Sequence, residues 1–338
     1  AKLETNDKDD CLIVTSIQKM SRINPDNNVP ESTIKKINSK RVVFIIDECH
    51  RGVFGKMLLS IKNTFPRAVL FGFTGTPVFE ENSKKEITTE VIFGDMLHKY
   101  TLGNGIPDGN VLGFDLNRED DMTEYELREM VALHEAEVDT VEQIGDDPEK
   151  KAKYDAVMND WTILKVEDKA KSFYQSNEHH IAVANKIVAE RPVLSVNGKF
   201  HAILATKNIP EAIEYYRIFK TRFPEYHVAT VFDDSIDNEE RAIYKEDAIL
   251  EMLEDYNNTF GTHFQQSTYA KYKKDVAKRL AHKAPYAHID QDHQLDLLIV
   301  VTQMLTGYDS KYINTLYADK LLEYVDVIQA FSRTNRLF

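Results

Sequence analysis

Short apolar stretches recur along the chain, and between them lie segments whose apolar residues are spaced three or four positions apart. Stretches of the first kind are typical of buried strands, and segments of the second kind are typical of amphipathic helices. Because the two kinds alternate, the sequence predicts an α/β fold with parallel sheets that helices cover on both faces. The predicted strands cover residues 11–15, 42–46, 68–73, 201–206, 227–232 and 297–302.

The helical pattern changes character in the middle of the chain. Three glycines and a proline interrupt the alternation at residues 104–113, and residues 115–190 are strongly acidic with helical spacing. The alternation then resumes near residue 200. Helices are predicted within residues 54–65, 122–141, 147–161, 210–219 and 238–284.

Composition is that of a globular protein. The 338 residues are 42% hydrophobic, which is enough for two cores of ordinary size. We find no apolar stretch near the roughly 18 residues of a membrane span and no leader before residue 20, so the sequence predicts a soluble, cytoplasmic protein. Cys11 and Cys49 form no disulfide framework and are expected to be buried thiols.

The first candidate for chemistry follows the apolar run at residues 42–46, where Asp47, Glu48, Cys49 and His50 come in succession. A buried parallel strand that delivers two adjacent carboxylates is typical of a magnesium and water site in nucleotide hydrolysis. Asp47 would hold Mg²⁺ bound to the phosphates, and Glu48 would orient or deprotonate the attacking water. His50 would transmit the state of the hydrolysis site to the residues outside it. The alternative is an ordinary strand with an acidic end.

Three later segments favour the hydrolytic interpretation. Residues 68–77 form a second strand that ends in a turn with Thr74, Gly75 and Thr76, and residues 295–309 repeat the arrangement. Near the end of the chain, Arg333 and Arg336 are spaced to lie on one face of a predicted helix. Arginines so placed can reach a γ-phosphate across a cleft, although a solvated helix face with a salt bridge gives the same pattern.

In order and content, these segments resemble the motif set of superfamily-two helicases. The matching motifs are DECH (II), TGTP (III), VVTQMLTGYDS (V) and QAFSRTNR (VI). Among the families of this superfamily, the LYADK phrase before motif VI and the FGDMLHKY phrase at residues 93–100 resemble the motor (R) subunit of type I restriction–modification enzymes. The resemblance runs over nearly the whole chain.

The resemblance implies two RecA-like helicase lobes, each a parallel sheet covered by helices, with ATP and Mg²⁺ as cofactors. It also implies translocation along double-stranded DNA, in a complex with specificity and methyltransferase subunits. The implied domains are residues 1–112 (the C-terminal part of lobe 1, with motifs Ib, II and III), 113–190 (an acidic helical segment between the lobes) and 191–338 (lobe 2, with motifs IV, V and VI).

The resemblance also assigns roles to individual residues, by group. The catalytic residues are Asp47, Glu48, Arg333 and Arg336, and the remaining nucleotide-binding residues are His50, Gln329, Gly307 and Asp309. Coupling between the lobes is assigned to His50, Thr74, Gly75 and Thr76. DNA contacts are assigned to Thr15, Gln18, Thr302 and Thr306. Lys273 and Lys274 are further candidates for DNA contact, because they lie in a stretch that mixes tyrosine with basic residues at 269–279. For the two lysines, a solvated amphipathic helix gives the same composition. His282, His288 and His293 fit no common metal-ligand spacing and are expected to be solvated.

One part of the helicase pattern is missing. The sequence contains no G-x-x-x-x-G-K-[ST] phosphate loop, so we expect the chain to be a fragment that begins inside the first lobe and lacks the nuclease domain. A net charge of −13 argues against tight nonspecific DNA binding by this piece alone. Two alternatives stay open. One is another translocase or helicase of the superfamily, acting in repair or remodelling, and the other is a helicase-like scaffold without ATPase activity.

Overall fold

We analysed a computed structural model of the chain. The structure describes residues 3, 12–49, 54–77, 79, 88–117, 123–171, 173–232, 242–301, 308–320, 322 and 325–337. The chain falls into two compact units, Ala1–Gly105 with Glu323–Gln329 and Ile106–Leu322 with Ala330–Phe338. The predicted domain boundaries stay a prediction.

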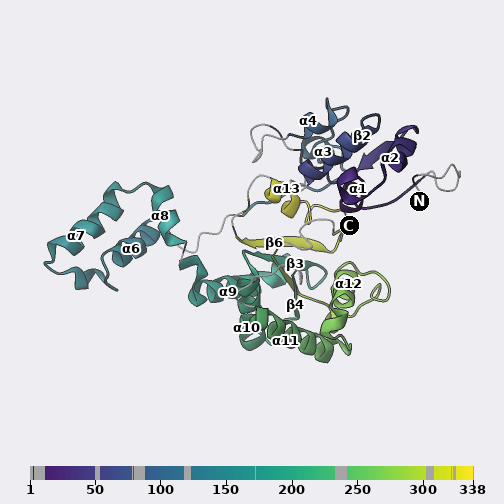
Figure 1. Cartoon of the computed structure of the whole chain (residues 1–338). Helices are drawn as coiled ribbons and strands as arrows, with labels where there is room; N and C mark the ends of the chain where they lie inside the picture. The colour runs from purple at the N-terminus through teal and green to yellow at the C-terminus, as the bar shows by residue number, and fades with distance from the viewer. Residues whose placement is uncertain are drawn as a thin grey trace. The chain divides into compact units, whose positions relative to one another are not determined.

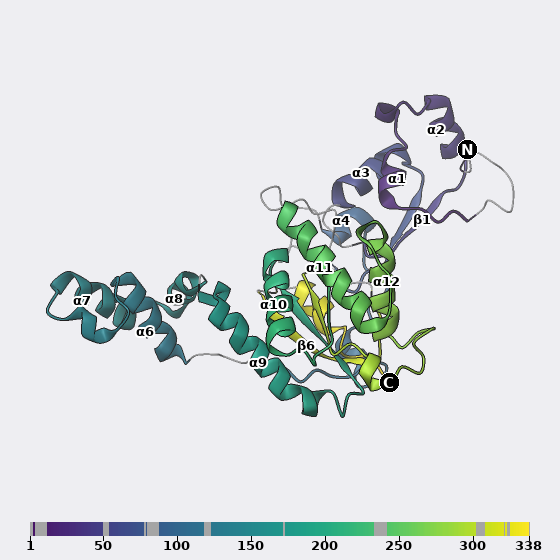
Figure 2. The same ribbon diagram turned by 90° about the horizontal axis from the view of Figure 1, so that it is seen from below.

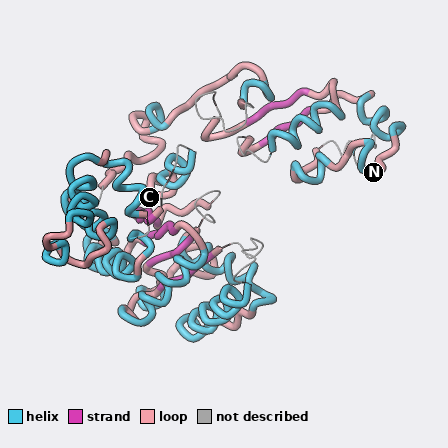
Figure 3. Tube along the Cα trace, turned by 60° about the vertical axis from the view of Figure 1, so that its left-hand side comes forward, coloured by secondary structure: helices cyan, strands magenta, loops and turns pink. Residues whose placement is uncertain are grey.

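The first unit contains a two-stranded parallel sheet (Figures 1 and 3). Strand β1 (Val43–Ile46) pairs with β2 (Val69–Gly72) in a register that sets Val43 opposite Val69 and Ile46 opposite Gly72. The accompanying helices are α1 (Ile17–Ser21), α2 (Glu31–Asn38), α3 (Phe54–Thr64), α4 (Thr89–Phe93) and α5 (Leu102–Gly105).

Helices α1, α2 and α3 contribute to a hydrophobic core on one side of this sheet. Met20, Ile37 and Ile61 are buried in the core together with Phe65, whose ring centroid lies 5.7 Å from that of Phe44 on β1. These contacts follow from the pleat of the strand, which directs alternate side chains to opposite faces. The core therefore fixes β1, and with it the residues that follow β1 in the sequence.

The other face of this sheet is exposed. Ile45 is 72% exposed and Phe71 is 40% exposed, so burial alternates along β1. Parallel sheets are normally covered on both faces. The expectation that this strand is buried throughout was therefore wrong for alternate residues.

The second unit contains a four-stranded parallel sheet in the order β4-β5-β3-β6 (Figures 2 and 3). Every residue of β3 and β5 is buried, which means that both faces of the centre of the sheet are covered. The strands are β3 (His201–Thr206), β4 (Val228–Val231), β5 (Leu297–Val300) and β6 (Ile313–Asp319).

Long helices pack against this sheet and complete its hydrophobic core. Figure 2 shows α10 and α11 beside the sheet, and the Tyr272 hydroxyl on α12 donates a hydrogen bond of 3.0 Å to the Thr230 carbonyl of β4. Helix α10 begins after Asn208, whose side chain accepts the backbone N–H of Glu211. These helices are α9 (Asn177–Leu194), α10 (Ile209–Arg222), α11 (Ala242–Phe260) and α12 (Tyr269–Leu280). Most of the short helix α13 (Val325–Phe331) belongs to the first unit, which includes Glu323–Gln329.

A second, smaller core lies in the acidic middle of the chain, within residues 123–173. Thr123 and Glu126 form a capping box at the start of α6 (Glu124–Glu135), which packs against α8 (Ile163–Ala170) through Val131 and Val166. Between α6 and α8 lie α7 (Pro148–Asp155) and one π-helical turn, Ala156–Asp160. The helical character predicted for this segment is confirmed.

The α/β fold with parallel sheets flanked by helices is confirmed, and two strand predictions need correction. Residues 12–15 form no strand, because Ser16 caps the short helix α1 directly after them. Strand β6 was missed, because an edge strand with partly exposed residues shows no continuous apolar run. Among the described residues, no helix is long and apolar enough to cross a membrane.

Candidate functional site

The two carboxylates predicted to act in hydrolysis lie at the carboxyl end of β1. Asp47 is exposed and Glu48 is half-buried. The backbone N–H of Glu48 donates a 2.9 Å hydrogen bond to Oδ1 of Asp47, which turns the chain sharply after the strand. Glu48 has a φ of 51°, in the left-handed region that non-glycine residues rarely adopt. Such strain is common at functional sites, because the surrounding structure must hold it in place.

The threonine turn after β2 lies at the same edge of the sheet. Phe73 donates its N–H to the Ile46 carbonyl at 2.8 Å, and Cys49 donates its N–H to the Phe73 carbonyl at 3.1 Å. These two bonds continue the β1–β2 pairing past the ends of the strands. The turn itself is closed by the N–H of Thr76, which donates to Oγ1 of Thr74 at 3.0 Å. The structure therefore brings Asp47 and Glu48 close to the turn at residues 74–76.

Gln329 joins this group of residues. Its side-chain amide donates a 3.1 Å hydrogen bond to Oγ1 of Thr76, and both residues belong to the first unit. Thr76 is buried, so this bond satisfies a hydroxyl that water does not reach. Gln329 is thus held at the turn.

Cys49 is buried beside these carboxylates. Burial raises the pKa of its thiol, an effect that the neighbouring charges of Asp47 and Glu48 reinforce. A thiol with a raised pKa is a poor nucleophile. The expectation of a buried thiol is confirmed for Cys49.

The two arginines lie in the second unit, and their expected position on one helical face was wrong. Helix α13 ends at Phe331, and Arg333 is already in the turn that follows it. Arg333 donates a hydrogen bond to the Tyr308 carbonyl, and Arg336 Nε lies 3.1 Å from Oδ1 of Asp309. The structure therefore brings both arginines next to the segment that resembles motif V.

The described residues assigned to DNA belong to both units. Thr15 and Gln18 are exposed in the first unit, and Lys274 is exposed on α12. Lys273 Nζ lies 5.0 Å from the ring centroid of Tyr269, which is buried in the core together with Tyr272. These tyrosines are therefore unable to stack on bases, and the burial pattern of α12 is that of an amphipathic helix. The predicted positions His50, Thr302, Thr306 and Gly307 lie outside the described residues.

One histidine expectation was wrong. His282 is half-buried, stacks on Tyr312 with ring centroids 3.8 Å apart, and has its Nε2 2.8 Å from Nε2 of His201. His288 and His293 are exposed, as expected. His201 was not predicted to have a role, because a single histidine at the start of an apolar run gives no signal of its partner.

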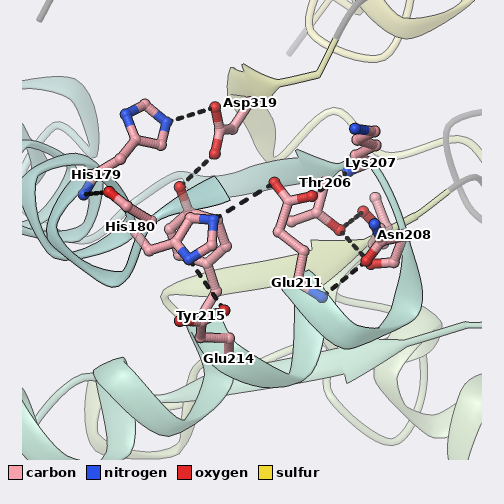
Figure 4. A network of polar contacts seen from close by, with 11 residues as sticks. His179, His180, Thr206, Lys207, Asn208, Glu211, Glu214, Tyr215 and Asp319 are labelled. Atoms are coloured by element: carbon pink, nitrogen blue, oxygen red, sulfur yellow. Dashed lines mark hydrogen bonds and ion pairs between the residues drawn. The ribbon is translucent and has the colours of Figure 1, made fainter. Parts of the chain in front are cut away.

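A second polar network, formed by residues of α9, α10 and β6, was also missed (Figure 4). It includes His180, Glu211 and Asp319, which are buried or half-buried in the second unit. Asp319 belongs to the LYADK phrase, which served only to identify the family resemblance. Because the three residues are far apart in the sequence, their spacing could not reveal the network.

Comparisons with known proteins agree with the motif order. Residues 1–151 match the SWI2/SNF2 ATPase family, and residues 198–338 match the family described as type I restriction enzyme subunit R domain 3. An endonuclease subunit of a type I restriction enzyme from Staphylococcus aureus (strain COL) is 32% identical over 99% of this chain. A corresponding subunit from Staphylococcus saprophyticus is 34% identical over 99%, and a putative one from Methanocaldococcus jannaschii is 23% identical over 97%.

The chain spans 33% of the length of the staphylococcal relatives and 27% of the archaeal one. The resemblance to the R subunit is confirmed: the chain contains a SWI2/SNF2 ATPase region followed by R subunit domain 3. An ATPase region implies that nucleotide binds here.

Proposed function

We propose that this chain, whose sequence is that of the ATPase region and domain 3 of a type I restriction enzyme R subunit, is the ATP-driven core of a double-stranded DNA translocase. The observation that carries the proposal is the edge of the β1–β2 sheet. Two carboxylates, Asp47 and Glu48, end one strand there, and the threonine turn that holds Gln329 ends the other.

Asp47 fits the role of a magnesium ligand. Carboxylate oxygens are the ligands that Mg²⁺ prefers, and the exposed side chain of Asp47 is accessible to an incoming metal–nucleotide complex. When bound, Mg²⁺ would neutralise phosphate charge. Glu48, held in its left-handed conformation, would orient or deprotonate the attacking water.

Thr76 and Gln329 would transmit the state of the bound nucleotide from the turn after β2 to helix α13. Their hydrogen bond links the turn after β2 to the helix that leads to Arg333. Arg333 and Arg336 would stabilise the negative charge that develops on the γ-phosphate, and Asp309 would position Arg336 through their ion pair. Hydrolysis would then change the conformation of the motor and move it along DNA.

The setting of this activity is proposed from the relatives. Within a type I restriction enzyme, this region would work with specificity and methyltransferase subunits, and cleavage would come from a nuclease domain not found in these 338 residues. A restriction motor of this kind is expected to be stimulated by duplex DNA and not by single strands.

Glu48→Gln in the complete motor subunit tests the proposal. The amide keeps the size of the side chain but cannot accept a proton, so turnover should fall at least about a hundredfold while ATP binding is retained. The measurements are duplex-stimulated ATP hydrolysis and binding of a fluorescent ATP analogue. Glu31→Gln, on the exposed surface of α2, is the matched control and should hydrolyse ATP normally. Normal turnover of Glu48→Gln would show that Glu48 is structural.

A further inference from the structure

The network in Figure 4 joins three elements of the second unit. His180 comes from α9, Glu211 from the first turn of α10, and Asp319 from the carboxyl end of β6. Each offers a ligand atom, and these atoms all lie within 4.8 Å of one another. None of the three residues has a part in the nucleotide chemistry proposed above, so the cluster needs its own explanation.

His180 lacks the hydrogen bonds that a buried imidazole normally makes. Its side chain is only 2% exposed, and neither ring nitrogen has a hydrogen-bond partner among the residues that the structure describes. Nε2 faces Oε1 of Glu211 at 3.9 Å, and Nδ1 approaches Oε2 of Glu214 at 3.2 Å without the alignment of a hydrogen bond. A buried polar group without a partner is costly, and a bound ion is one of the few explanations.

The two carboxylates are held in place by hydrogen bonds on their other sides. Oε2 of Glu211 accepts the backbone N–H of Lys207 at 3.2 Å. Asp319 accepts hydrogen bonds from His179 Nε2, at 2.9 Å, and from the Tyr215 hydroxyl. Outer partners of this kind orient the ligands in many metal sites. Both carboxylates therefore have fixed positions before any ion binds.

Glu211 and Asp319 bring two negative charges into the cluster. Two carboxylates this close together in a largely buried place repel each other and lose their hydration, so a positive charge between them is strongly favoured. The charge of Lys207 offsets the burial of Glu211 and the negative charge of Asp319 only in part. A divalent cation would bring the net charge of the cluster to zero.

We propose that His180 Nε2, Glu211 and Asp319 bind one divalent transition-metal ion, of which Zn²⁺ is the probe. Tetrahedral ligand bonds of about 2.1 Å place donor atoms about 3.4 Å apart, so the 3.9 Å between His180 and Glu211 needs to close by only about 0.5 Å. A separation of 4.8 Å, the upper limit among the three ligand atoms, closes with side-chain shifts that sum to about 1.4 Å. An imidazole ligand favours Zn²⁺ over Mg²⁺ or Ca²⁺, which prefer oxygen alone.

The ion would fasten α9 and α10 to the edge strand β6. Helix α9 follows the small helical core of residues 123–173 in the sequence, so the ion would fix the first long helix that leads from that core to the sheet. The ion would also let Nδ1 of His180 donate to Glu214, as metal-bound histidines usually donate to a carboxylate. This role is structural and separate from ATP hydrolysis.

Calorimetric titration of the full chain with Zn²⁺, without nucleotide, tests the proposal. We expect one site with a dissociation constant below about 10 µM, and at about a hundredfold excess over that constant a melting temperature raised by roughly 3–6 °C. His180→Gln and Glu211→Gln should each weaken Zn²⁺ binding at least about a hundredfold. Tyr215→Phe, which removes only an outer hydrogen bond to Asp319, should weaken it about tenfold.

His288→Gln is the matched control, because His288 is an exposed histidine of the same unit. It should bind Zn²⁺ like the wild type. The proposal is overturned if the wild type binds no Zn²⁺ at one equivalent, or if His180→Gln binds as well as the wild type. Should a variant fail to fold, the visible spectrum of Co²⁺ bound to the wild-type chain decides. Intense bands typical of four ligands, removed by one equivalent of Zn²⁺, support the site, and their absence overturns it.

Discussion

At the scale of single residues, the structure pairs groups that the sequence leaves unrelated. His201 is buried at the start of β3, where its Nδ1 donates a 2.6 Å hydrogen bond to the Leu295 carbonyl. That bond fixes the neutral tautomer, so Nε2 is left to accept a hydrogen bond from His282. Burial, reinforced by the nearby His282, lowers the pKa of His201 to about 3. Burial of the histidine pair therefore favours the neutral form of His201.

This lowered pKa predicts a loss of stability in mild acid. The folded state resists protonation of His201 and the unfolded state does not, so stability is complete above the unfolded pKa of 6.5 and is lost as the pH falls towards about 3. Between about pH 7.5 and pH 5, His201 should account for about 2 kcal/mol of lost unfolding free energy. Urea unfolding of the wild type and of His201→Gln, which does not titrate, measures the difference. His288→Gln should lose stability as the wild type does, and an identical loss in His201→Gln would contradict the assignment.

The arginines of the second unit allow a prediction about catalysis. Arg333→Ala and Arg336→Ala in the complete motor should each lower ATP turnover at least about tenfold and weaken ATP binding less, because charge at the γ-phosphate develops mainly in the transition state. Steady-state hydrolysis and nucleotide binding measure the two effects. Since both arginines contact the same segment, at Tyr308 and Asp309, the double variant should lose less than the product of the single losses.

Arg222→Ala, an exposed arginine at the end of α10, is the control for that series and should hydrolyse ATP normally. Asp309→Asn should reproduce part of the Arg336→Ala defect, because it removes the charge that positions Arg336. Strictly multiplicative losses in the double variant would mean that the two arginines act independently.

At the scale of elements, close packing at the end of β2 determines where the threonine turn lies. A Cβ added to Gly72 would lie 2.8 Å from Sγ of Cys49 and 3.0 Å from the ring of Phe93 on α4. A methyl group at this position would therefore force the side chains of Cys49 and Phe93 to move. Glycine at this position therefore lets β2, α4 and the residue after Glu48 come together.

Gly72→Ala should consequently destabilise the chain by about 1–3 kcal/mol, the usual cost of overpacking a core. Chemical denaturation followed by circular dichroism measures this cost. Gly75→Ala is the matched control for folding, because a Cβ at Gly75 would meet nothing within 4 Å. Equal stability of the two variants would show that Cys49 and Phe93 can move away from the added methyl group without a cost in free energy, which would contradict the prediction.

The elements differ in how far the sequence predicted them. Strand β5 and helix α10 were predicted almost to their ends, because a continuous apolar run and a helix opened by Pro210 and Glu211 are strong local signals. Strand β6 was not predicted, since its pairing with β3 stabilises it more than its own composition does. The helix predicted to carry both arginines ends at Phe331, five residues before Arg336. Beyond it, contacts with Tyr308 and Asp309 hold the two arginines.

At the scale of the whole molecule, the sequence contains the carboxylates and arginines proposed to act in hydrolysis but no phosphate-loop motif. The sequence contains no G-x-x-x-x-G-K-[ST], so the backbone N–H groups and the lysine that hold the phosphates are missing. The 338-residue chain by itself should therefore hydrolyse ATP negligibly, even with duplex DNA present. A phosphate-release assay measures this directly. Turnover near that of a complete motor would show that the phosphates are held in another way.

The sequence by itself determined the family, the α/β class and the position of two carboxylates at a strand end, because each depends on residues that are neighbours along the chain. Asp47 and Glu48 follow an apolar run, and that order already predicts carboxylates at the edge of a sheet. Only the tertiary structure brought together Gln329 and Thr76, His201 and His282, and the cluster of His180, Glu211 and Asp319. Pairing and packing bring such distant residues into contact, and no local pattern records which partner a buried polar group will meet.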